Sequence, residues 1–312
     1  AGQFLCHQKS AFVEACKPEW LPKNDSALEE KIAFLSAAES NNIFPFPEQL
    51  STAIEKESFL LSFLQQPDVF LRLRPGKEKM VVDKLQKAAI PFSQEGFCLR
   101  LPAAAKIDDL LRIDEEAVVQ DISSQRVLEL LQARLTKTSF TAWDCCAASG
   151  GKTILLHDAY PQAKLTVSDI RESIIINLKN RLKRAGIAHY RSFVGDVSSP
   201  QFTMPQQFDV IVCDAPCSGS GTWGRTPEQL VFFKQEKIMH YAGLQKSIAV
   251  TASHCLKKGG FFLYITCSVF AEENERVTDY LQQEKGLQLL SQQYFNGYDK
   301  KGDTLFAALF TI

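Results

Sequence analysis

The sequence predicts an α/β protein whose larger part is an open, parallel, doubly wound sheet. From about residue 139 onward, short apolar segments alternate with helical segments, which is the order that a parallel sheet requires. An acid or a thiol stands at or just after the end of each of five predicted strands. Because ligands bind at the carboxyl ends of the strands in such sheets, this placement predicts a functional site along one edge.

Two smaller parts precede this sheet. Residues 1–65 are predicted to be helical and irregular, with several prolines as breaks. Residues 66–118 are predicted to form a small α+β module that is similar to an RNA-recognition motif. It has a strand at 69–73, a helix at about 78–89 and a second extended segment around 97–101. Its basic side chains could follow the backbone of a nucleic acid.

Residues 119–312 form the larger domain. Its first helix is expected to be capped by Ser123 or Ser124. The apolar side of that helix is formed by Val127, Leu128, Leu131 and Leu135. Strands are predicted near 139–145, 164–169, 190–195, 208–213 and 261–266. Helices are predicted at about 151–160, 172–185, 228–257 and 271–283. A short extended segment near Leu287 and a final antiparallel strand at about 304–310 are expected to close the sheet.

The predicted strand ends carry four acids and one thiol to the same rim. These residues are Asp144, Asp169, Asp196, Asp214 and Cys267. A single aspartate at a strand end is often only a turn or helix cap. The complete set, at successive strand ends, indicates a site.

The charge pattern allows contact with a polyanion without requiring it. The net charge of −1 argues against a uniformly positive surface. Two local runs are nevertheless basic. They are Arg72, Arg74, Lys77, Lys79, Lys84 and Lys87, and then Lys179, Arg181, Lys183, Arg184 and Arg191. Each run is either a face that contacts RNA or an ordinary solvated helix face.

The cysteines indicate a reducing compartment. All nine are expected to be unpaired, most of them as small buried side chains, and no two form a Cys-x-x-Cys pair. The sequence therefore predicts neither a disulfide framework nor a metal site. No apolar run is long enough for a membrane span, and the amino terminus lacks the pattern of a secretion signal. We expect a cytoplasmic monomer with no membrane and no metal as partner.

The loop at 144–153 predicts a binding site for a nucleoside. Its sequence, Asp-Cys-Cys-Ala-Ala-Ser-Gly-Gly-Lys-Thr, ends like a phosphate-binding loop, but Cys146 stands where that loop needs its first glycine. A dinucleotide-binding Gly-x-Gly-x-x-Gly is also missing. The remaining candidate ligand is a nucleoside without a phosphate chain. Asp169 could accept hydrogen bonds from its ribose hydroxyls, and Asp196 could meet an adenine amino group. S-adenosylmethionine fits that description.

Four segments together resemble the Nol/Nop/Sun group of S-adenosylmethionine-dependent RNA cytosine-C5 methyltransferases. They are Val119–Gln125, the loop Asp144–Thr153, Asp214–Gly221 followed by Arg225 and Pro227, and Tyr264–Val269. The resemblance covers Val69 to Ile312 and implies a Rossmann-like class I methyltransferase sheet with a smaller amino-terminal α+β part that binds RNA. One departure is Ser149, where the group usually has proline.

The resemblance also implies the roles of the site residues. Cys267 is the attacking thiol, Cys217 aids product release, Asp214 hydrogen-bonds the cytosine ring nitrogen, and Lys152 orients Asp214 or the base. The residues implied to bind S-adenosylmethionine are Cys146, Ala147, Ala148, Ser149, Gly150, Gly151, Lys152, Asp169, Arg171, Asp196 and Asp214.

Cytosine chemistry explains why two thiols are useful. Carbon 5 is a poor nucleophile until a thiolate adds to carbon 6, and the adduct must later eliminate. The expected partner is RNA, with ribosomal RNA favoured over transfer RNA, and Trp223 is either a base-stacking platform or a packing residue. A non-catalytic RNA-binding assembly factor on the same scaffold remains the alternative from another class.

Overall fold

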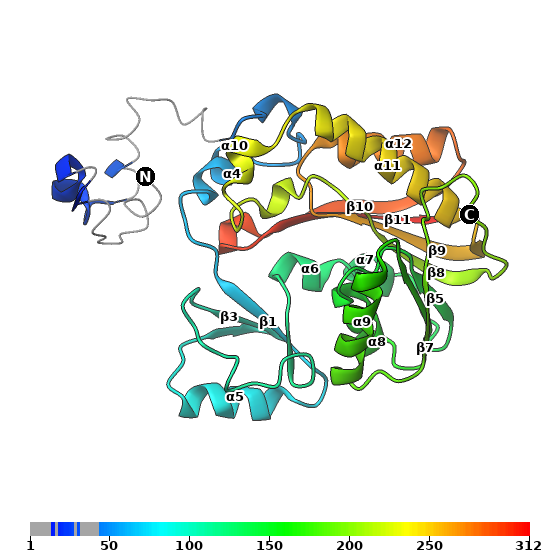
Figure 1. Ribbon diagram of the computed structural model, residues 1–312, viewed down its shortest axis with the longest axis horizontal. Coiled ribbons are helices and arrows are strands. Elements are labelled where there is room, and N and C mark those ends of the chain that lie inside the picture. The colour runs from blue at the N-terminus through cyan, green and yellow to red at the C-terminus, as the bar shows by residue number, and fades with distance from the viewer. Residues whose placement is uncertain (1–13, 16–17, 28–29, 32–43) are drawn as a thin grey trace.

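The computed structural model describes residues 14–15, 18–27, 30–31 and 44–312. A seven-stranded sheet lies at its centre (Figure 1). The strands follow the spatial order β10-β11-β9-β8-β5-β6-β7. Their bounds are β5 Thr141–Asp144, β6 Lys164–Asp169, β7 Tyr190–Val194, β8 Phe208–Asp214, β9 Leu256–Thr266, β10 Gln288–Asn296 and β11 Thr304–Thr311. The predicted α/β class and doubly wound sheet are confirmed.

The direction of the last strand is as predicted, but its position is not. Strands β7, β6, β5, β8 and β9 are parallel, and β11 runs antiparallel to β9. Strand β11 lies inside the sheet, because β10 pairs with its other side and forms the edge. The short segment expected near Leu287 is therefore a full strand. The full length of this strand was not predicted, because most of its side chains are polar or not buried. An edge strand needs no continuous apolar run.

Helices cover both faces of the sheet. On one face lie α7 (Glu129–Gln132), α8 (Gly151–Ala159) and α9 (Glu172–Arg184), and on the other α11 (Glu236–Ser253) and α12 (Glu275–Gln283). Adjacent residues of β8 point to opposite sides: Val212 packs in the first core and Cys213 in the second. This period of two lets one buried strand join both cores.

Two predicted helices are interrupted. The helix expected at 228–257 is α10 (Gln229–Phe232) followed by α11, because Phe233 is extended and buried among aromatic rings, and residues 256–257 already belong to β9. The helix expected after residue 122 is α6 (Ile122–Arg126) and then α7. The cap of α6 is Asp121, whose carboxylate accepts from the Ser123 backbone N–H at 2.9 Å, so the prediction of Ser123 or Ser124 was wrong.

A second, antiparallel sheet of four strands precedes the large one. Its order is β2-β3-β1-β4, with β1 Val69–Leu73, β2 Ser93–Glu95, β3 Cys98–Leu101 and β4 Ala117–Val119. Helix α5 (Glu78–Lys87) packs Val81 and Leu85 on one face of this sheet. On the other face Phe70 and Cys98 contact Ile122 of the larger domain.

Part of the first basic run joins the two sheets instead of facing solvent. Arg72 of β1 and Arg74, which directly follows β1, are both buried and pair with Asp158 of α8 at 2.5 and 2.9 Å. Neither guanidinium is available to follow an RNA backbone, so that expectation is wrong for these two residues. In the second run Arg181 and Arg184 of α9 are likewise paired, with the buried Asp114.

Residues 44–65 pack on the larger domain. They contain a short 3₁₀ turn (Pro47–Gln49) and helix α4 (Lys56–Ser62). Phe44 and Phe59 join Trp223 and Phe270 in one aromatic cluster. Most of the preceding residues assigned to the helical and irregular segment lie outside the described part of the chain. Within the described part, no helix has the length and apolar content needed to cross a bilayer.

Candidate active site

Loops at the carboxyl edge of the large sheet form the candidate site. Asp144, Asp169 and Asp214 end β5, β6 and β8, and Cys267 directly follows β9. The order of the strands reverses between β5 and β8, since β6 and β7 lie on one side of β5 and β9 on the other side of β8. Sheets of this kind bind their ligands at such a switch point.

The loop after β5 is held by its backbone and needs a glycine at one position. Ala147 N–H donates to the Ser168 carbonyl at 2.9 Å, and Ala148 N–H donates to the Asp169 carboxylate at 3.2 Å. Gly150 has φ +86°, and a Cβ there would lie 2.3 Å from Leu178 Cδ1. A larger residue would therefore strain the backbone and displace the Leu178 side chain of α9.

A cavity of about 340 Å³ opens beside this loop. Six of the residues expected to bind the cofactor line it: Cys146, Ala148, Asp169, Arg171, Asp196 and Asp214. Its apolar walls come from Ile170, Val197, Leu244 and Ile248. Arg171, the single cation in the lining, already pairs with Asp169 at 3.0 Å. A mixed lining of this size suits a small organic ligand.

The other five expected cofactor residues do not line the cavity. Ala147, Gly150 and Gly151 shape the loop and begin α8, while Lys152 faces Asp214. The exposed Ser149 turns outward, and its hydroxyl oxygen accepts a hydrogen bond from Arg181 at 3.0 Å. The residue that replaces the usual proline thus contacts α9 on the outside of the loop.

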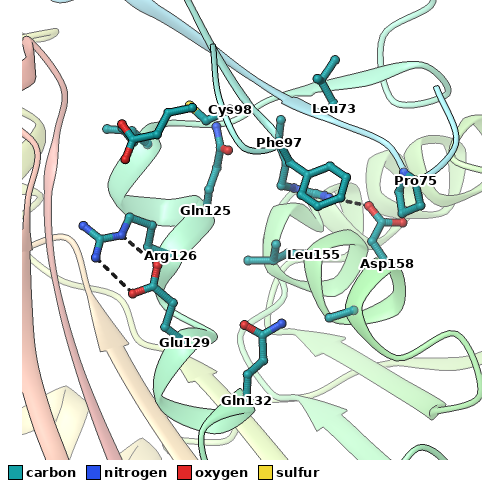
Figure 2. Close-up of a pocket in the computed structure, with 14 residues that line it drawn as sticks. Leu73, Pro75, Phe97, Cys98, Gln125, Arg126, Glu129, Gln132, Leu155 and Asp158 are labelled. Carbon is teal, nitrogen blue, oxygen red and sulfur yellow. Dashed lines mark hydrogen bonds and ion pairs between the residues drawn. The ribbon is translucent and has the colours of Figure 1, made fainter. Parts of the chain in front are cut away.

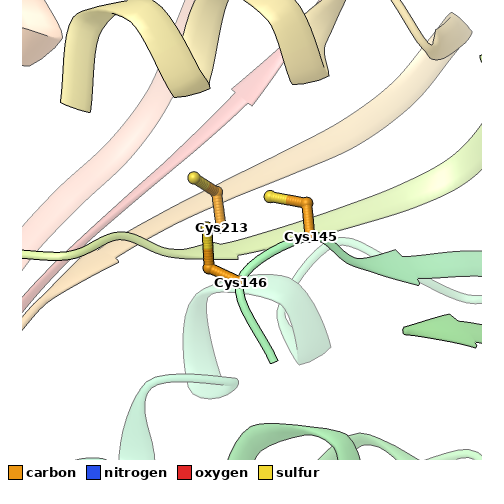
Figure 3. A group of neighbouring side chains, drawn as sticks. All are labelled: Cys145, Cys146 and Cys213. Atoms are coloured by element: carbon orange, nitrogen blue, oxygen red, sulfur yellow. The ribbon is translucent and has the colours of Figure 1, made fainter. Parts of the chain in front are cut away.

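Three cysteines gather behind the cavity (Figure 3). The sulfurs of Cys145, Cys146 and Cys213 lie within 4.8 Å of one another, where the loop after β5 passes the end of β8. Cys145 and Cys213 are fully buried in the core and Cys146 is half-buried, and both Cys145 and Cys146 line the cavity. Cys145 and Cys213 therefore have the packing role that the composition predicted for most of the cysteines.

Lys152 and Asp214 form an ion pair at the cavity edge. The Nζ of Lys152 lies 3.0 Å from Oδ2 of Asp214, and the lysine side chain is 11% exposed. Burial lowers the pKa of Lys152, but the nearby charges of Asp214, Cys267 and Asp144 outweigh it and raise the pKa. Lys152 is therefore a permanent cation in a partly dry site, and it fixes the orientation of Asp214.

Asp144 is a buried acid beneath this pair. The Thr153 hydroxyl donates to its Oδ2 at 2.6 Å, and its Oδ1 has no hydrogen-bond partner. Burial raises the pKa of Asp144 to about 7, and the charge of Asp214 acts in the same direction. The carboxyl can therefore carry a proton near neutral pH.

The two cysteines of the sequence motifs face each other. The Sγ atoms of Cys217 and Cys267 are 3.2 Å apart, although the residues are 50 positions apart in the chain, and both side chains are half-buried. The hydrogen bond with Cys267 and burial raise the pKa of Cys217 well above its ordinary value. Two sulfurs at this distance can act on one substrate atom in turn.

The structure decides one alternative that the sequence left open and adds one residue that the sequence did not reveal. Trp223 is 1% exposed, packs against Phe44 and Phe233, and donates to the Ser218 carbonyl at 3.2 Å, so it is a packing residue and not a base-stacking platform. Glu273, which sequence reasoning missed, is fully buried and hydrogen-bonds the residues after both cysteines. Its sequence context, an acidic run that starts a helix, is typical of a solvated surface.

A second cavity, of about 360 Å³, lies apart from this site (Figure 2). It is enclosed by β3 of the small sheet and by α6, α7 and α8. Phe97 forms one wall with 56% of its surface exposed, and the ion pair of Arg126 with Glu129 forms another. None of the predicted catalytic residues lines it.

The chain is similar in sequence to bacterial ribosomal RNA methyltransferases. The model of the family described as 16S rRNA methyltransferase RsmB/F matches residues 128–306. Ribosomal RNA small subunit methyltransferase B of Serratia proteamaculans is 32% identical over 72% of this chain, and that of Proteus mirabilis is 31% identical over 85%. The chain spans 54% and 62% of the lengths of these relatives.

The fold is also shared with a solved structure. NSun6 from Pyrococcus horikoshii, solved with SFG, has a TM-score of 0.75 to this chain and covers 87% of it and 97% of its own length. The sequence identity between the two chains is 14%, so the likeness concerns the fold alone.

Proposed function

The chain belongs to the 16S rRNA methyltransferase RsmB/F family, and from this premise we propose that it transfers a methyl group from S-adenosylmethionine to carbon 5 of a cytosine in ribosomal RNA. One observation carries the proposal beyond the family name. The sulfurs of Cys217 and Cys267 lie 3.2 Å apart beside the ion pair of Lys152 and Asp214. Methylation at carbon 5 of a pyrimidine needs a thiolate at carbon 6, whereas methylation of an amino group does not.

The cavity beside the loop after β5 fits S-adenosylmethionine. Asp169, which is 6% exposed, would hold the ribose hydroxyls once Arg171 moves away, and Asp196 at the open end would meet the adenine amino group. The cavity has no unpaired cation in its lining, which suits a nucleoside better than a phosphate chain. When bound, the cofactor supplies an electrophilic methyl group.

The side chains then have separate tasks. Cys267 adds to carbon 6 of the cytosine, and Asp214, oriented by Lys152, passes the proton that the Cys267 thiol gives up to the ring nitrogen that gains electron density. This makes carbon 5 nucleophilic enough to accept the methyl group. A base then removes the proton from carbon 5, Cys267 is expelled, and Cys217 assists this release at 3.2 Å from the sulfur that leaves.

The substrate cytosine must be unpaired or turned out of its helix. Carbon 6 of a stacked base cannot reach a half-buried thiol, and extruding a paired base costs a few kcal/mol. Ribosomal RNA is the substrate that the family description favours, with transfer RNA as the second candidate. We place the protein in the cytoplasm as a monomer that needs no metal ion.

Each of the three parts of the chain has its own role in this proposal. Residues 119–312 carry the chemistry, and 66–118, with their own core between α5 and the small sheet, contribute to RNA binding. Residues 1–65 are assigned as the third part, and of these residues 44–65 brace the loops that carry the two cysteines.

Labelled methyl transfer tests the proposed function. The protein is incubated with S-adenosylmethionine carrying a labelled methyl group and with unmodified small-subunit ribosomal RNA, and in parallel with transfer RNA. The RNA is then digested to nucleosides. We expect label in 5-methylcytidine from the ribosomal RNA, and none with Cys267→Ala. Label in a different nucleoside would refute the assignment of carbon 5. Label in transfer RNA alone would show that transfer RNA, and not ribosomal RNA, is the substrate.

A further inference from the structure

A fully buried carboxylate stands behind the two cysteines. Glu273 ends the 3₁₀ turn Ala271–Glu273, six residues after Cys267, and its exposed fraction is 0%. Its backbone is anchored as well, because the Tyr264 hydroxyl donates to its carbonyl oxygen at 2.7 Å. An acid this deeply buried needs compensating partners.

Its partners are the residues that follow the cysteines. The Ser218 backbone N–H donates to Oε2 of Glu273 at 2.8 Å, and the Ser268 hydroxyl donates to Oε1 at 3.0 Å. Gln245 of α11 supplies a third donor at 2.9 Å. Ser218 comes directly after Cys217 and Ser268 directly after Cys267. One carboxylate therefore joins the two loops next to the two thiols.

Charges of opposite sign lie beside the two thiols. Burial raises the pKa of Glu273, whereas the hydrogen bonds from Ser218, Gln245 and Ser268 act in the opposite direction and favour the ionised acid. After the hydrogen bond with Cys267, burial and the charge of Cys267, the charge of Glu273 also contributes to the raised pKa of Cys217. On the other side, the charge of Cys267 contributes, after that of Asp214, to the raised pKa of Lys152. The anion therefore disfavours a Cys217 thiolate, and the cation Lys152 interacts with the Cys267 side of the pair.

We propose that Glu273 is a positioning residue that ties the two cysteine loops together and makes Cys267, not Cys217, the nucleophile. Cys217 stays a thiol and donates a hydrogen bond to the Cys267 sulfur. Besides Cys267 and Glu273, two tyrosines face Cys217: Tyr241 of α11 and Tyr264 of β9. Burial raises the pKa of both phenols, so they are neutral and do not alter this balance of charge. The proposal rests on the proposed function for its catalytic meaning.

The charge is tested with Glu273→Gln, which keeps the size of the side chain and one acceptor oxygen. Wild type and variant are labelled briefly with iodoacetamide between pH 6 and 9, and the labelled peptides of Cys217 and Cys267 are quantified by mass spectrometry. Wild type should label mainly at Cys267. In the variant, the ratio of Cys217 to Cys267 labelling at pH 7.5 should rise by about threefold or more, because the thiolate fraction follows the thiol pKa.

The tie between the loops is tested with Glu273→Asp, which keeps the charge and shortens the side chain. The oxidant diamide is added, and formation of the Cys217–Cys267 disulfide is followed by peptide mass spectrometry. This bond requires the sulfurs to approach from 3.2 Å to bonding distance. The shorter side chain should slow cross-linking by about tenfold while the labelling ratio stays that of wild type.

Glu275→Gln is the matched control. Glu275 lies two residues further along and contacts Ser51 and Tyr294 but neither cysteine loop. It should leave both thiol measurements unchanged. An unaltered labelling ratio in Glu273→Gln would overturn the role of the charge, and an unaltered cross-linking rate in Glu273→Asp would overturn the tie. Neither measurement uses RNA or a methyl donor, so a failure of the proposed methylation is distinguished from a failure of this proposal.

Discussion

At the scale of single residues, the candidate site is organised by Lys152. Its ammonium group is nearly buried and lies 3.0 Å from Asp214, within the field of Cys267 and Asp144. A permanent cation at this point orients one acid and favours negative charge on the neighbouring thiol. No water-exposed lysine could do both, because solvent would screen its charge.

Replacing Lys152 should therefore slow the chemical step more than it weakens binding. Lys152→Met keeps the length of the side chain and removes the charge, and we expect the rate of methyl transfer under single-turnover conditions to fall by about 10²–10³-fold. The affinity for S-adenosylmethionine, measured by calorimetry, should change by less than about threefold. Lys179→Met, on α9 outside the cavity lining, is the control. A similar loss in both variants would contradict this role of Lys152.

Asp144 should make folding stability depend on pH. Burial raises its pKa from 3.8 to about 7, so the folded protein holds a proton that the unfolded chain has released. The resulting stability is fully present below about pH 4 and is lost as the pH rises through about 7. Asp144→Asn, which cannot ionise, should flatten this decline and raise the free energy of unfolding at pH 8 by a few kcal/mol in urea titrations.

Asp209 provides a control of opposite sign. Burial raises its pKa, but the hydrogen bonds from Lys257 and Thr141 outweigh burial and lower it to about 2. Its contribution to stability is therefore present above about pH 4 and is lost as the pH falls toward 2. If Asp144→Asn followed the wild-type curve at every pH, the buried-acid account of Asp144 would be wrong.

The residues that we propose take part in bond-making could be identified from sequence because each stands in a short motif near a strand end. Lys152, Asp214, Cys217 and Cys267 come from three segments that the fold brings together. Glu273 could not be predicted, since its local sequence resembles a solvated helix start and its function depends on contacts to distant loops.

At the scale of elements, the loops that carry the cysteines are braced by the segment before β1. Trp223 lies six residues after Cys217, and Phe270 three residues after Cys267. Both rings pack on Phe44, at centroid distances of 5.5 and 5.8 Å. The cluster therefore holds the two catalytic loops against a third segment that is distant in sequence.

Removing the Phe44 ring should destabilise the protein strongly. The side chain is fully buried, so Phe44→Ala leaves a cavity and should lower the free energy of unfolding by about 3–5 kcal/mol. Chemical denaturation measures this loss. The matched control is Phe232→Ala, because Phe232 is 73% exposed and its loss should cost less than about 0.5 kcal/mol. Equal effects of the two substitutions would show that the cluster does not brace the domain.

The elements themselves were mostly predictable where an apolar period was clear. Strands β6 and β8 have continuous buried runs, and α9 has an amphipathic face. The break between α10 and α11 was not predictable, because it depends on Phe233 turning into an aromatic cluster formed by distant residues. The exposed edge strand β10 carries too weak a pattern to be recognised as a long strand.

At the scale of the whole molecule, the small and large sheets are joined by a buried ionic contact. Asp158 of α8 accepts from Arg72 of β1 and from Arg74, which directly follows β1, and all three side chains are less than 10% exposed. Basic residues in one run of sequence suggested a surface for RNA. Their actual role became visible only with the partner acid, which lies 84 residues or more away in the chain.

Breaking this contact should loosen the small sheet. Asp158→Asn leaves two buried guanidinium groups without their anion and should cost about 3–5 kcal/mol of unfolding free energy. Hydrogen exchange should become faster in β1 and β3. The control is Glu95→Gln. Glu95 lies on β2 of the small sheet and forms an exposed ion pair with Lys300, and losing this pair should cost about 0–1 kcal/mol of unfolding free energy. Unchanged exchange in Asp158→Asn would mean that this ionic contact does not hold the two sheets together.

The most direct test of the account is to trap the covalent intermediate. Cys217→Ala and Cys267→Ala are each incubated with S-adenosylmethionine and labelled small-subunit ribosomal RNA, and the products are separated on a denaturing protein gel. The account predicts an RNA adduct that persists with Cys217→Ala, because attack by Cys267 is intact and release is slow, and no adduct with Cys267→Ala. An adduct that accumulates with Cys267→Ala instead would contradict the assignment of the two thiols.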